Sequence, residues 1–384
     1  MTRTKLLFAF AVVVVPLEVL TSAPAPRDKI HLAPAGKVKV DNLVVNDAAL
    51  IDEYRVVIVG RTGSVEDDVA MFEGVPNGAI IDLAKKSAQH FANRHPTQIW
   101  GVSSYGGRIV TVSTGERVAG LTDCFMRTIV RGWDLKAQES KEVVKLGDSA
   151  ASCQVRCFHK SDRVVVDEVE QLFVLDPAKP KERMELACPA GVEFLSHPLA
   201  VSPDDAWIAC TGSERDQVVC FELATKKATV VAVTPKDAGE KWFVYGLAFS
   251  PSGKLYVCRG GNAEQVPKGK AEKDVPAERR GTVRIDLPDG KVVPLNMGHT
   301  FGTSGCAVDG TETWLATVGG SRPDKQPDGV FVGELRVYNL ASGKLAYREQ
   351  FEGGPGWVWF TPSGKRLVCA TSNGMVRWWD VPMR

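Results

Sequence analysis

The sequence lacks any surplus of one charge. Its 47 lysine and arginine residues are balanced by 46 aspartate and glutamate residues. A chain without a basic surplus has no general electrostatic attraction for nucleic acid or anionic lipid. The charged run from Lys268 to Arg280 mixes both signs, which is typical of a solvated loop. We therefore expect no nucleic-acid partner.

Beyond its N-terminal segment, the sequence also lacks a stretch that could cross a bilayer. A membrane-spanning helix needs about 20 apolar residues, and the apolar run Leu6 to Val15 is too short. Arg3 and Lys5 precede this run, and a small-residue, Pro-rich segment from Thr21 to Pro26 follows it. That order is typical of an export signal. We expect residues 1–25 to be a signal peptide, or alternatively an uncleaved N-terminal anchor, on a protein exported to the periplasm, the cell surface or the extracellular space.

Motifs that carry chemistry are missing as well. There is no Gly-x-Ser-x-Gly, no His-Glu-x-x-His, no Cys-x-x-Cys and no phosphate-binding glycine loop. The six histidines are scattered, and no spacing of cysteine and histidine resembles a zinc site. We therefore predict no catalytic residues, no metal and no cofactor.

Helical periodicity is scarce, and the best candidate for a helix is the segment Leu83 to Ala92. Short runs of β-branched and aromatic residues, separated by turn residues, are abundant instead. In the last stretch, Gly356 to Val381, three such runs are joined by Pro-Ser-Gly and Asn-Gly. Asn-Gly supplies the positive φ that a tight hairpin needs, so this stretch predicts an antiparallel meander.

The meander recurs, and seven copies are visible. Their predicted second strands are Arg55 to Arg61, Gly107 to Ser113, Asp162 to Glu168, Ala206 to Gly212, Leu255 to Gly261, Thr313 to Gly320 and Arg366 to Ser372. Their third strands close on Asp82, Asp134, Asp176, Glu222, Asp286, Asn339 and Asp380, which are 52, 42, 46, 64, 53 and 41 residues apart. These spacings fit propeller blades of roughly 40 to 45 residues with insertions. Residues 30–384 are therefore predicted to form an all-β, seven-bladed β-propeller of four-stranded antiparallel blades.

Short motifs in these copies resemble those of one family. They are the turns Ser202-Pro203-Asp204 and Ser250-Pro251-Ser252, the pair Gly298-His299, and the Trp-Asp pairs Trp133-Asp134 and Trp379-Asp380. In them the chain resembles the WD-repeat (YVTN/WD-like) β-propeller family over about residues 37–384. The resemblance implies a binding platform more than any particular chemistry, because members of the family bind unrelated ligands.

The last copy has only three strands before the chain ends, which would leave an open sheet edge. The alternating segment Lys37 to Val40 precedes the first copy and is otherwise unassigned. We expect it to complete the last blade as its outermost strand.

The nine cysteines follow the repeats more than they follow a disulfide framework. Cys210, Cys258 and Cys369 align at one position of the second strand, where other copies have Ala316 or Thr111. Small residues at a repeated position indicate core packing, and cysteine behaves there as a small apolar residue. We expect mostly free, buried cysteines, with a bridge between Cys210 and Cys220 as the one alternative.

The connections between second and third strands fall into two classes. The small-residue position and the closing residue are 23 to 28 residues apart in copies 1, 2, 5 and 6, and 10 to 12 apart in copies 3, 4 and 7. In a ring of equivalent blades all these loops emerge on one face, so the long ones should form two walls of a trough across the channel mouth. They are Arg61 to Asn77, Thr114 to Arg127, Gly260 to Arg280 and Gly319 to Gly329. Tolerated insertion on surface loops is the alternative explanation.

Binding residues are expected in and between these walls, where aromatic residues and arginine dominate hot spots. The candidates are Arg61, Trp242, Arg259, Arg322 and Trp357. The sequence thus favours an exported, noncatalytic binding or scaffold module that holds a protein or peptide partner. Two alternatives remain: a secreted propeller enzyme, such as a lactonase-like hydrolase with its site at the channel mouth, and a structural scaffold within an envelope complex.

Overall fold

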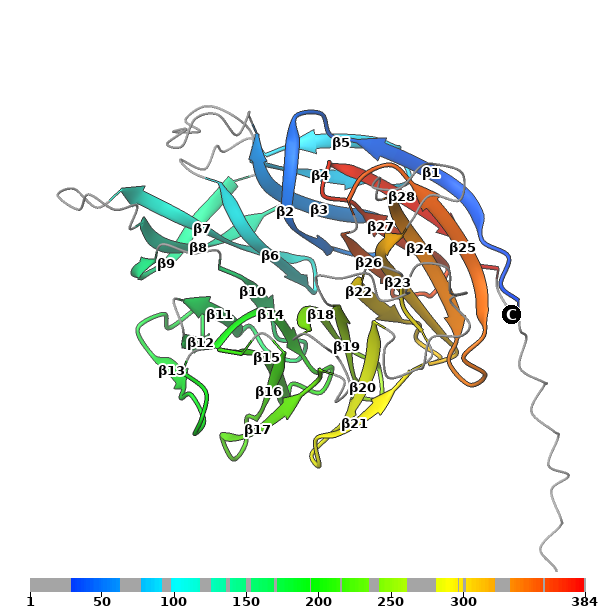
Figure 1. The fold of residues 1–384 in the computed structure, drawn as a ribbon. Coiled ribbons are helices and arrows are strands. Elements are labelled where there is room, and N and C mark those ends of the chain that lie inside the picture. Colours follow the sequence, from blue (N-terminus) through cyan, green and yellow to red (C-terminus); the bar gives the residue numbers. More distant parts are fainter. Residues whose placement is uncertain are drawn as a thin grey trace, which may run out of the picture.

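Seven four-stranded antiparallel sheets are arranged around a common axis (Figure 1). The structure is a computed structural model, and it describes residues 29–62, 77–91, 98–117, 126–135, 139–149, 153–168, 171–193, 195–214, 216–234, 242–260, 281–295, 297–299, 302–321, 332–354 and 356–382. Every regular element in these residues is a strand. The predicted all-β, seven-bladed β-propeller is confirmed.

Each sheet is one blade, and its strands pair from the axis outward. The innermost strands of blades 1 to 7 are β2 (Leu43–Leu50), β6 (Ile99–Tyr105), β10 (Val155–Cys157), β14 (Leu195–Val201), β18 (Phe243–Phe249), β22 (Thr303–Val308) and β26 (Trp357–Phe360). The second strands are β3 (Arg55–Thr62), β7 (Arg108–Arg117), β11 (Val164–Glu168), β15 (Trp207–Gly212), β19 (Leu255–Gly260), β23 (Trp314–Ser321) and β27 (Arg366–Ala370).

The outer half of each blade follows in the same order. The third strands are β4 (Gly78–Asp82), β8 (Met126–Asp134), β12 (Gln171–Leu175), β16 (Gln217–Glu222), β20 (Thr282–Asp286), β24 (Val332–Asn339) and β28 (Met375–Asp380). The outermost strands are β5 (Ser87–His90), β9 (Glu139–Ser149), β13 (Arg183–Leu186), β17 (Lys227–Ala232), β21 (Lys291–Pro294), β25 (Leu345–Phe351) and, in blade 7, β1 (Ala33–Lys39). All seven predicted second strands are present.

The predicted helix at Leu83 to Ala92 is wrong. Residues 83–86 form a turn, and Ser87–His90 form the exposed outer strand β5, which pairs with β4. Blade 1 needs a fourth strand at this point, and pairing with the edge of β4 overrides the weak local helical preference.

The ring closes as predicted, because β1 pairs antiparallel with β28 and completes blade 7. Figure 1 shows the N-terminal strand beside the C-terminal one. The strand begins four residues earlier than expected and ends at Lys39, and the Val40 amide then bonds to the Gly374 carbonyl. Before the strand, Ile30 and Leu32 pack into the interface between blades 6 and 7.

The apolar core lies between the blades and is not gathered at the centre. Second strands such as β19 are buried along their whole length, because each has a neighbouring blade on both faces. Seven apolar clusters result, and each joins two adjacent blades. The pairs are blades 7 and 1, 3 and 4, 6 and 7, 2 and 3, 4 and 5, 1 and 2, and 5 and 6.

Eight cysteines lie in the described residues, no disulfide joins any two of them, and seven are buried. Their predicted core role is therefore confirmed for those seven, and Cys124 lies outside the described residues. The alternative bridge between Cys210 and Cys220 is not formed. Neighbouring strands place the two side chains on opposite faces of blade 4, one packed toward blade 3 and the other toward blade 5.

The predicted equivalence of Cys258 with Cys210 is wrong by one residue. Cys210 packs toward the preceding blade, whereas Cys258 packs toward the following one. Before β15, the Ser202 amide bonds to the Trp207 carbonyl, five residues on. Before β19, the Ser250 amide bonds to the Lys254 carbonyl, four residues on, so this turn is one residue shorter. A one-residue shift in a strand moves a side chain to the opposite face.

Acidic side chains join neighbouring blades through the turns between first and second strands. Glu312 of blade 6 accepts hydrogen bonds from the Ser250 hydroxyl at 2.7 Å, the Ser252 amide at 2.7 Å and the Lys254 ammonium at 2.8 Å, all in blade 5. Glu53 of blade 1 accepts from the turn of blade 7 in the same manner. These carboxylates hold turns together that no backbone ladder connects.

Loss of β1 should open the ring. A chain that begins at Val40 lacks Ile30 and Leu32, whose burial contributes about 1.5–3 kcal/mol each, and it exposes the edge of β28. We expect thermal unfolding to begin at a markedly lower temperature, or the protein to aggregate. A chain that begins at Lys29 is the control and should melt like the full chain. Equal melting of both truncated chains would contradict the closure role of β1.

Glu312 should make stability depend on acidity. Partial burial opposes its ionisation, but hydrogen bonds from Lys254, Ser252 and Ser250 dominate and lower its pKa to about 2. A depressed pKa stabilises the fold above the unfolded value, near 4.5, and this stability is lost as the pH falls toward 2. We expect Glu312→Gln to cost about 1–2 kcal/mol at pH 7 and almost nothing at pH 2. Urea unfolding measures this, with the exposed Glu352→Gln as the control.

Candidate functional site

The innermost strands enclose a central cavity of about 470 Å³ with two unlike sides. The side formed by blades 2 and 3 is polar and carries Ser103, Ser104, Gln154, Arg156 and His159. The side formed by blades 5 and 7 is aromatic and carries Tyr245, Phe249, Trp357, Trp359 and Phe360. In a ring of seven blades these two sides face one another across the channel.

An irregularity near the start of the innermost strand recurs around the ring. The register with the second strand shifts at this point in blades 1, 2, 4, 5 and 6. In blades 5 and 6 the extra residues are Tyr245 and Ser304, and both line the cavity. A bulge takes a residue out of the ladder and redirects its side chain. Tyr245 is 45% exposed as a result, at the end of the channel where the second-to-third strand loops emerge.

The polar side is held together by Arg156 of β10. Its Nη1 donates to Asp47 Oδ2 in blade 1 at 2.9 Å and to the Val102 carbonyl in blade 2 at 3.2 Å. Its Nε donates to the Leu199 carbonyl in blade 4 at 3.2 Å, and its Nη2 to Gln154 Oε1 at 3.2 Å. One guanidinium therefore bonds to the innermost strands of four consecutive blades.

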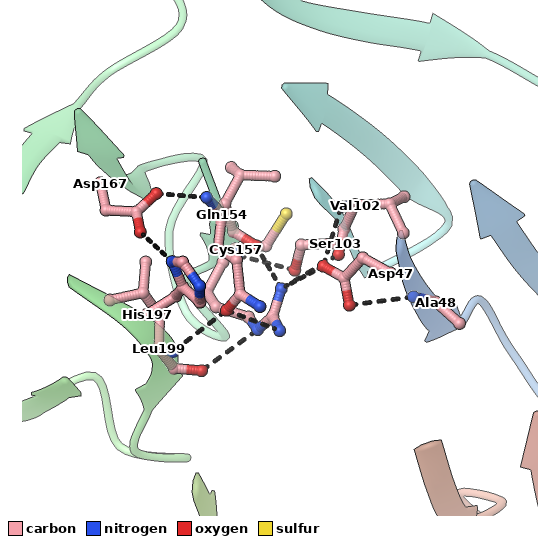
Figure 2. A network of polar contacts seen from close by, with 11 residues as sticks. Asp47, Ala48, Val102, Ser103, Gln154, Cys157, Asp167, His197 and Leu199 are labelled. Atoms are coloured by element: carbon pink, nitrogen blue, oxygen red, sulfur yellow. Dashed lines mark hydrogen bonds and ion pairs between the residues drawn. The ribbon is translucent and has the colours of Figure 1, made fainter. Parts of the chain in front are cut away.

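Asp47 is the fully buried partner of this arginine. Its carboxylate also accepts the backbone amides of Ala48 at 2.9 Å and Val102 at 3.1 Å. Figure 2 shows how the contacts run from Asp47 and Val102 to Gln154 and on to Asp167 and His197. A buried carboxylate needs this number of donors, because an uncompensated charge in the interior is strongly unfavourable. The network therefore braces the channel wall.

Three residues at the end of this network have the composition of a hydrolase triad without its geometry. Ser196 Oγ and Asp167 Oδ2 each lie 3.3 Å from the same atom, His197 Nδ1. Nucleophilic catalysis needs the hydroxyl on one ring nitrogen and the carboxylate on the other, so that a proton can be relayed between them. With both groups on Nδ1, the imidazole joins β14 to β11 and is not placed to relay a proton from Ser196 to Asp167.

Among the residues that the structure describes, no three His, Cys, Asp or Glu side chains are grouped so that they could hold a metal ion. In the same residues, no helix has the length and apolar character that a membrane span requires.

The structure places the five predicted binding residues differently from one another. Trp357 lines the aromatic side of the cavity, and Arg61 is half-buried on β3. Trp242 and Arg259 are 5% and 2% exposed. They contact one another inside blade 5, with the guanidinium 5.0 Å from the indole centroid. Arg322 lies outside the described residues.

The predicted trough also falls largely outside the described residues. These omit 63–76, 118–125, 261–280 and 322–331, which hold most of the four long loops. The three short connections are described for the most part, and they join β11 to β12, β15 to β16 and β27 to β28. The walls therefore stay a prediction.

Sequence reasoning missed the residues that shape the channel. A single arginine in a short strand and an aspartate in β2 show no repeat pattern, so neither Arg156 nor Asp47 was singled out. Tyr245 belongs to no motif in the sequence. Its signal is one extra residue between the strand start and the following turn, which becomes visible only when the β18 and β19 ladder is counted.

Removal of Arg156 should weaken the channel wall. Arg156→Met leaves Asp47 charged, buried and without its cation, which typically costs about 3–5 kcal/mol. Asp47→Asn in the same chain removes that charge and should recover roughly half of the loss. Urea unfolding of the two single variants and the double variant measures the coupling. Strictly additive losses would contradict a direct role for the ion pair.

No protein-family model matches this chain, and no curated protein sequence matches it.

Proposed function

We propose that the chain is a propeller of the WD-repeat type. Two of the motif residues support this, because they make side-chain hydrogen bonds within single blades. His299 of the Gly-His pair lies 2.9 Å from Thr317 Oγ1, and Trp133 of a Trp-Asp pair donates to Thr111 Oγ1 at 2.9 Å. Both hydroxyls occupy second strands, in blades 6 and 2. In blade 6, Nδ1 of the same histidine lies 3.4 Å from the fully buried Glu334.

We further propose that the protein is an exported, noncatalytic binding module for a protein or peptide partner. The observation that carries this proposal is the exposed Tyr245, which lines the aromatic side of the central cavity, as Trp357 does. Exposed aromatic side chains at the rim of a concave site are the usual anchors of protein interfaces. A cavity of about 470 Å³ is large enough for side chains of a partner to enter the channel mouth.

Opposed polar and aromatic sides suit a peptide better than a purely apolar ligand. The aromatic side offers contact area, and the polar side offers hydrogen-bonding groups such as Gln154. The Arg156 network already holds the polar side chains in place in the free protein. Binding of a partner therefore loses little conformational entropy on this side. The charged start and short apolar run of the first 26 residues support export.

Site-specific photo-crosslinking tests where the partner binds. A crosslinking amino acid at Tyr245 should capture one defined polypeptide from the medium or envelope fraction of the producing cell. Tyr54 is the matched control, because it is also exposed, at 50%, and lies in a turn on the opposite face of the ring. Capture at position 54 in place of 245 would contradict the proposed site.

Affinity measurements on the captured partner test the anchors. We expect Tyr245→Ala and Trp357→Ala each to weaken binding about tenfold, as removal of a hot-spot side chain worth about 1.4 kcal/mol does. Tyr54→Ala should leave the affinity unchanged. Hydrolysis of a lactone or ester by the purified protein, lost in His197→Ala, would instead favour the hydrolase alternative.

A further inference from the structure

Two cysteines from different blades meet beside the channel. Cys258 lies on β19 of blade 5 and Cys306 on β22 of blade 6. Both belong to the apolar cluster that joins these two blades. Cys210, on the second strand of blade 4, packs toward the preceding blade and lies on the far side of its blade from Cys220.

A glycine brings the two strands together. Gly246 is the partner of Cys258 in the ladder between β18 and β19. A Cβ atom at Gly246 would lie 2.5 Å from the Ser304 carbonyl oxygen and 3.3 Å from the Gly305 Cα of β22. Because no side chain intervenes, β22 packs directly against this point of blade 5. Cys258 and Cys306 lie in the same buried cluster there, and the two thiols are near enough to affect one another's ionisation.

The two thiols differ in access. Cys306 lines the central cavity and is 9% exposed, whereas Cys258 is completely buried behind it. Burial, followed by the neighbouring Cys306, raises the pKa of the Cys258 thiol well above its ordinary value. A reagent that enters the channel therefore meets Cys306 first.

We propose that Cys306 and Cys258 form a dithiol site that reacts with small disulfides through the channel and closes to a disulfide between blades 5 and 6. In the first step the Cys306 sulfur attacks the disulfide R–S–S–R, forms a mixed disulfide and releases one R–S⁻. In the second step the Cys258 sulfur attacks the Cys306 sulfur, and the second R–S⁻ leaves. The two released thiolates take up the two protons that the cysteines lose, so two protein thiols are oxidised and one R–S–S–R is reduced to two R–SH.

This site adjoins the mouth residues. Tyr245 directly precedes Gly246, and Ser304 lies two residues before Cys306, so a bond between the thiols fixes the two bulged residues relative to one another. The oxidised ring is also linked covalently across an interface that is otherwise held by packing and by the hydrogen bonds of Glu312. The inference does not depend on the proposed partner, because it concerns the chemistry of the chain alone.

Oxidised glutathione is the probe. The native full chain is incubated with it, free thiols are blocked, and a nonreducing peptide map locates each product. We expect a peptide pair joined through Cys258 and Cys306, together with a melting temperature a few degrees higher than that of the reduced protein. Cys369→Ala removes a buried cysteine in the cluster between blades 6 and 7 and is the matched control. It should form the same linked pair as the unmodified chain.

Two variants separate the roles of the cysteines. Cys258→Ala should stop at a stable glutathione adduct on Cys306, whereas Cys306→Ala should show neither an adduct on Cys258 nor the linked pair. In the unmodified chain we expect Cys306 to react at least about tenfold faster than Cys369, which reacts only after local opening. The proposal would be overturned by equal reaction rates of Cys306 and Cys369. It would also be overturned if the unmodified chain kept a glutathione adduct on Cys306 or formed a link to any other cysteine.

Discussion

The structure depends on apolar burial between adjacent blades. No blade has a core of its own, because a single sheet of four strands leaves both faces apolar and each face is covered only by the next blade. Seven interfaces therefore need seven blades, and every interface depends on the ring being closed. The strand that closes it, β1, belongs to the start of the chain while the rest of its blade belongs to the end. The stability of the whole ring is consequently linked to a few residues around Ile30 to Lys39.

The channel is the place where this packing leaves room. Innermost strands approach one another closely where they carry glycine, as Gly246 and Gly305 do against the next blade. One extra residue before the glycine moves a side chain out of the ladder, and in blade 5 that residue is Tyr245. On the polar side, the innermost strand of blade 1 contains no glycine. The buried Asp47 and its ion pair with Arg156 hold the channel wall there. An aromatic side and a braced polar side follow from these two local solutions.

Periodic features could be predicted from the sequence, and single residues could not. The turn at Asn373-Gly374 and the strand Arg366–Ala370 each follow from the residue types within a few positions, so both can be predicted locally. The register of Cys258 was misread because a turn one residue shorter has little effect on local composition but reverses the face of the strand. Trp242 and Arg259 were chosen by residue type, and the structure packs them against each other inside blade 5.

The sequence alone determined the all-β class, the seven blades and the core position of most cysteines, because each depends on a pattern that repeats about every 50 residues. It also determined the closing strand, because the last copy has only three strands of its own. The tertiary structure alone decided which side chains meet across the ring. Arg156 and Asp47 are 109 residues apart, and their contact exists only when blades 1 and 3 are held around one axis. The same holds for Cys258 and Cys306, which come from successive blades. Contacts between blades depend on the direction in which each strand turns its side chains, and that direction is set by the register and bulges of the assembled sheets.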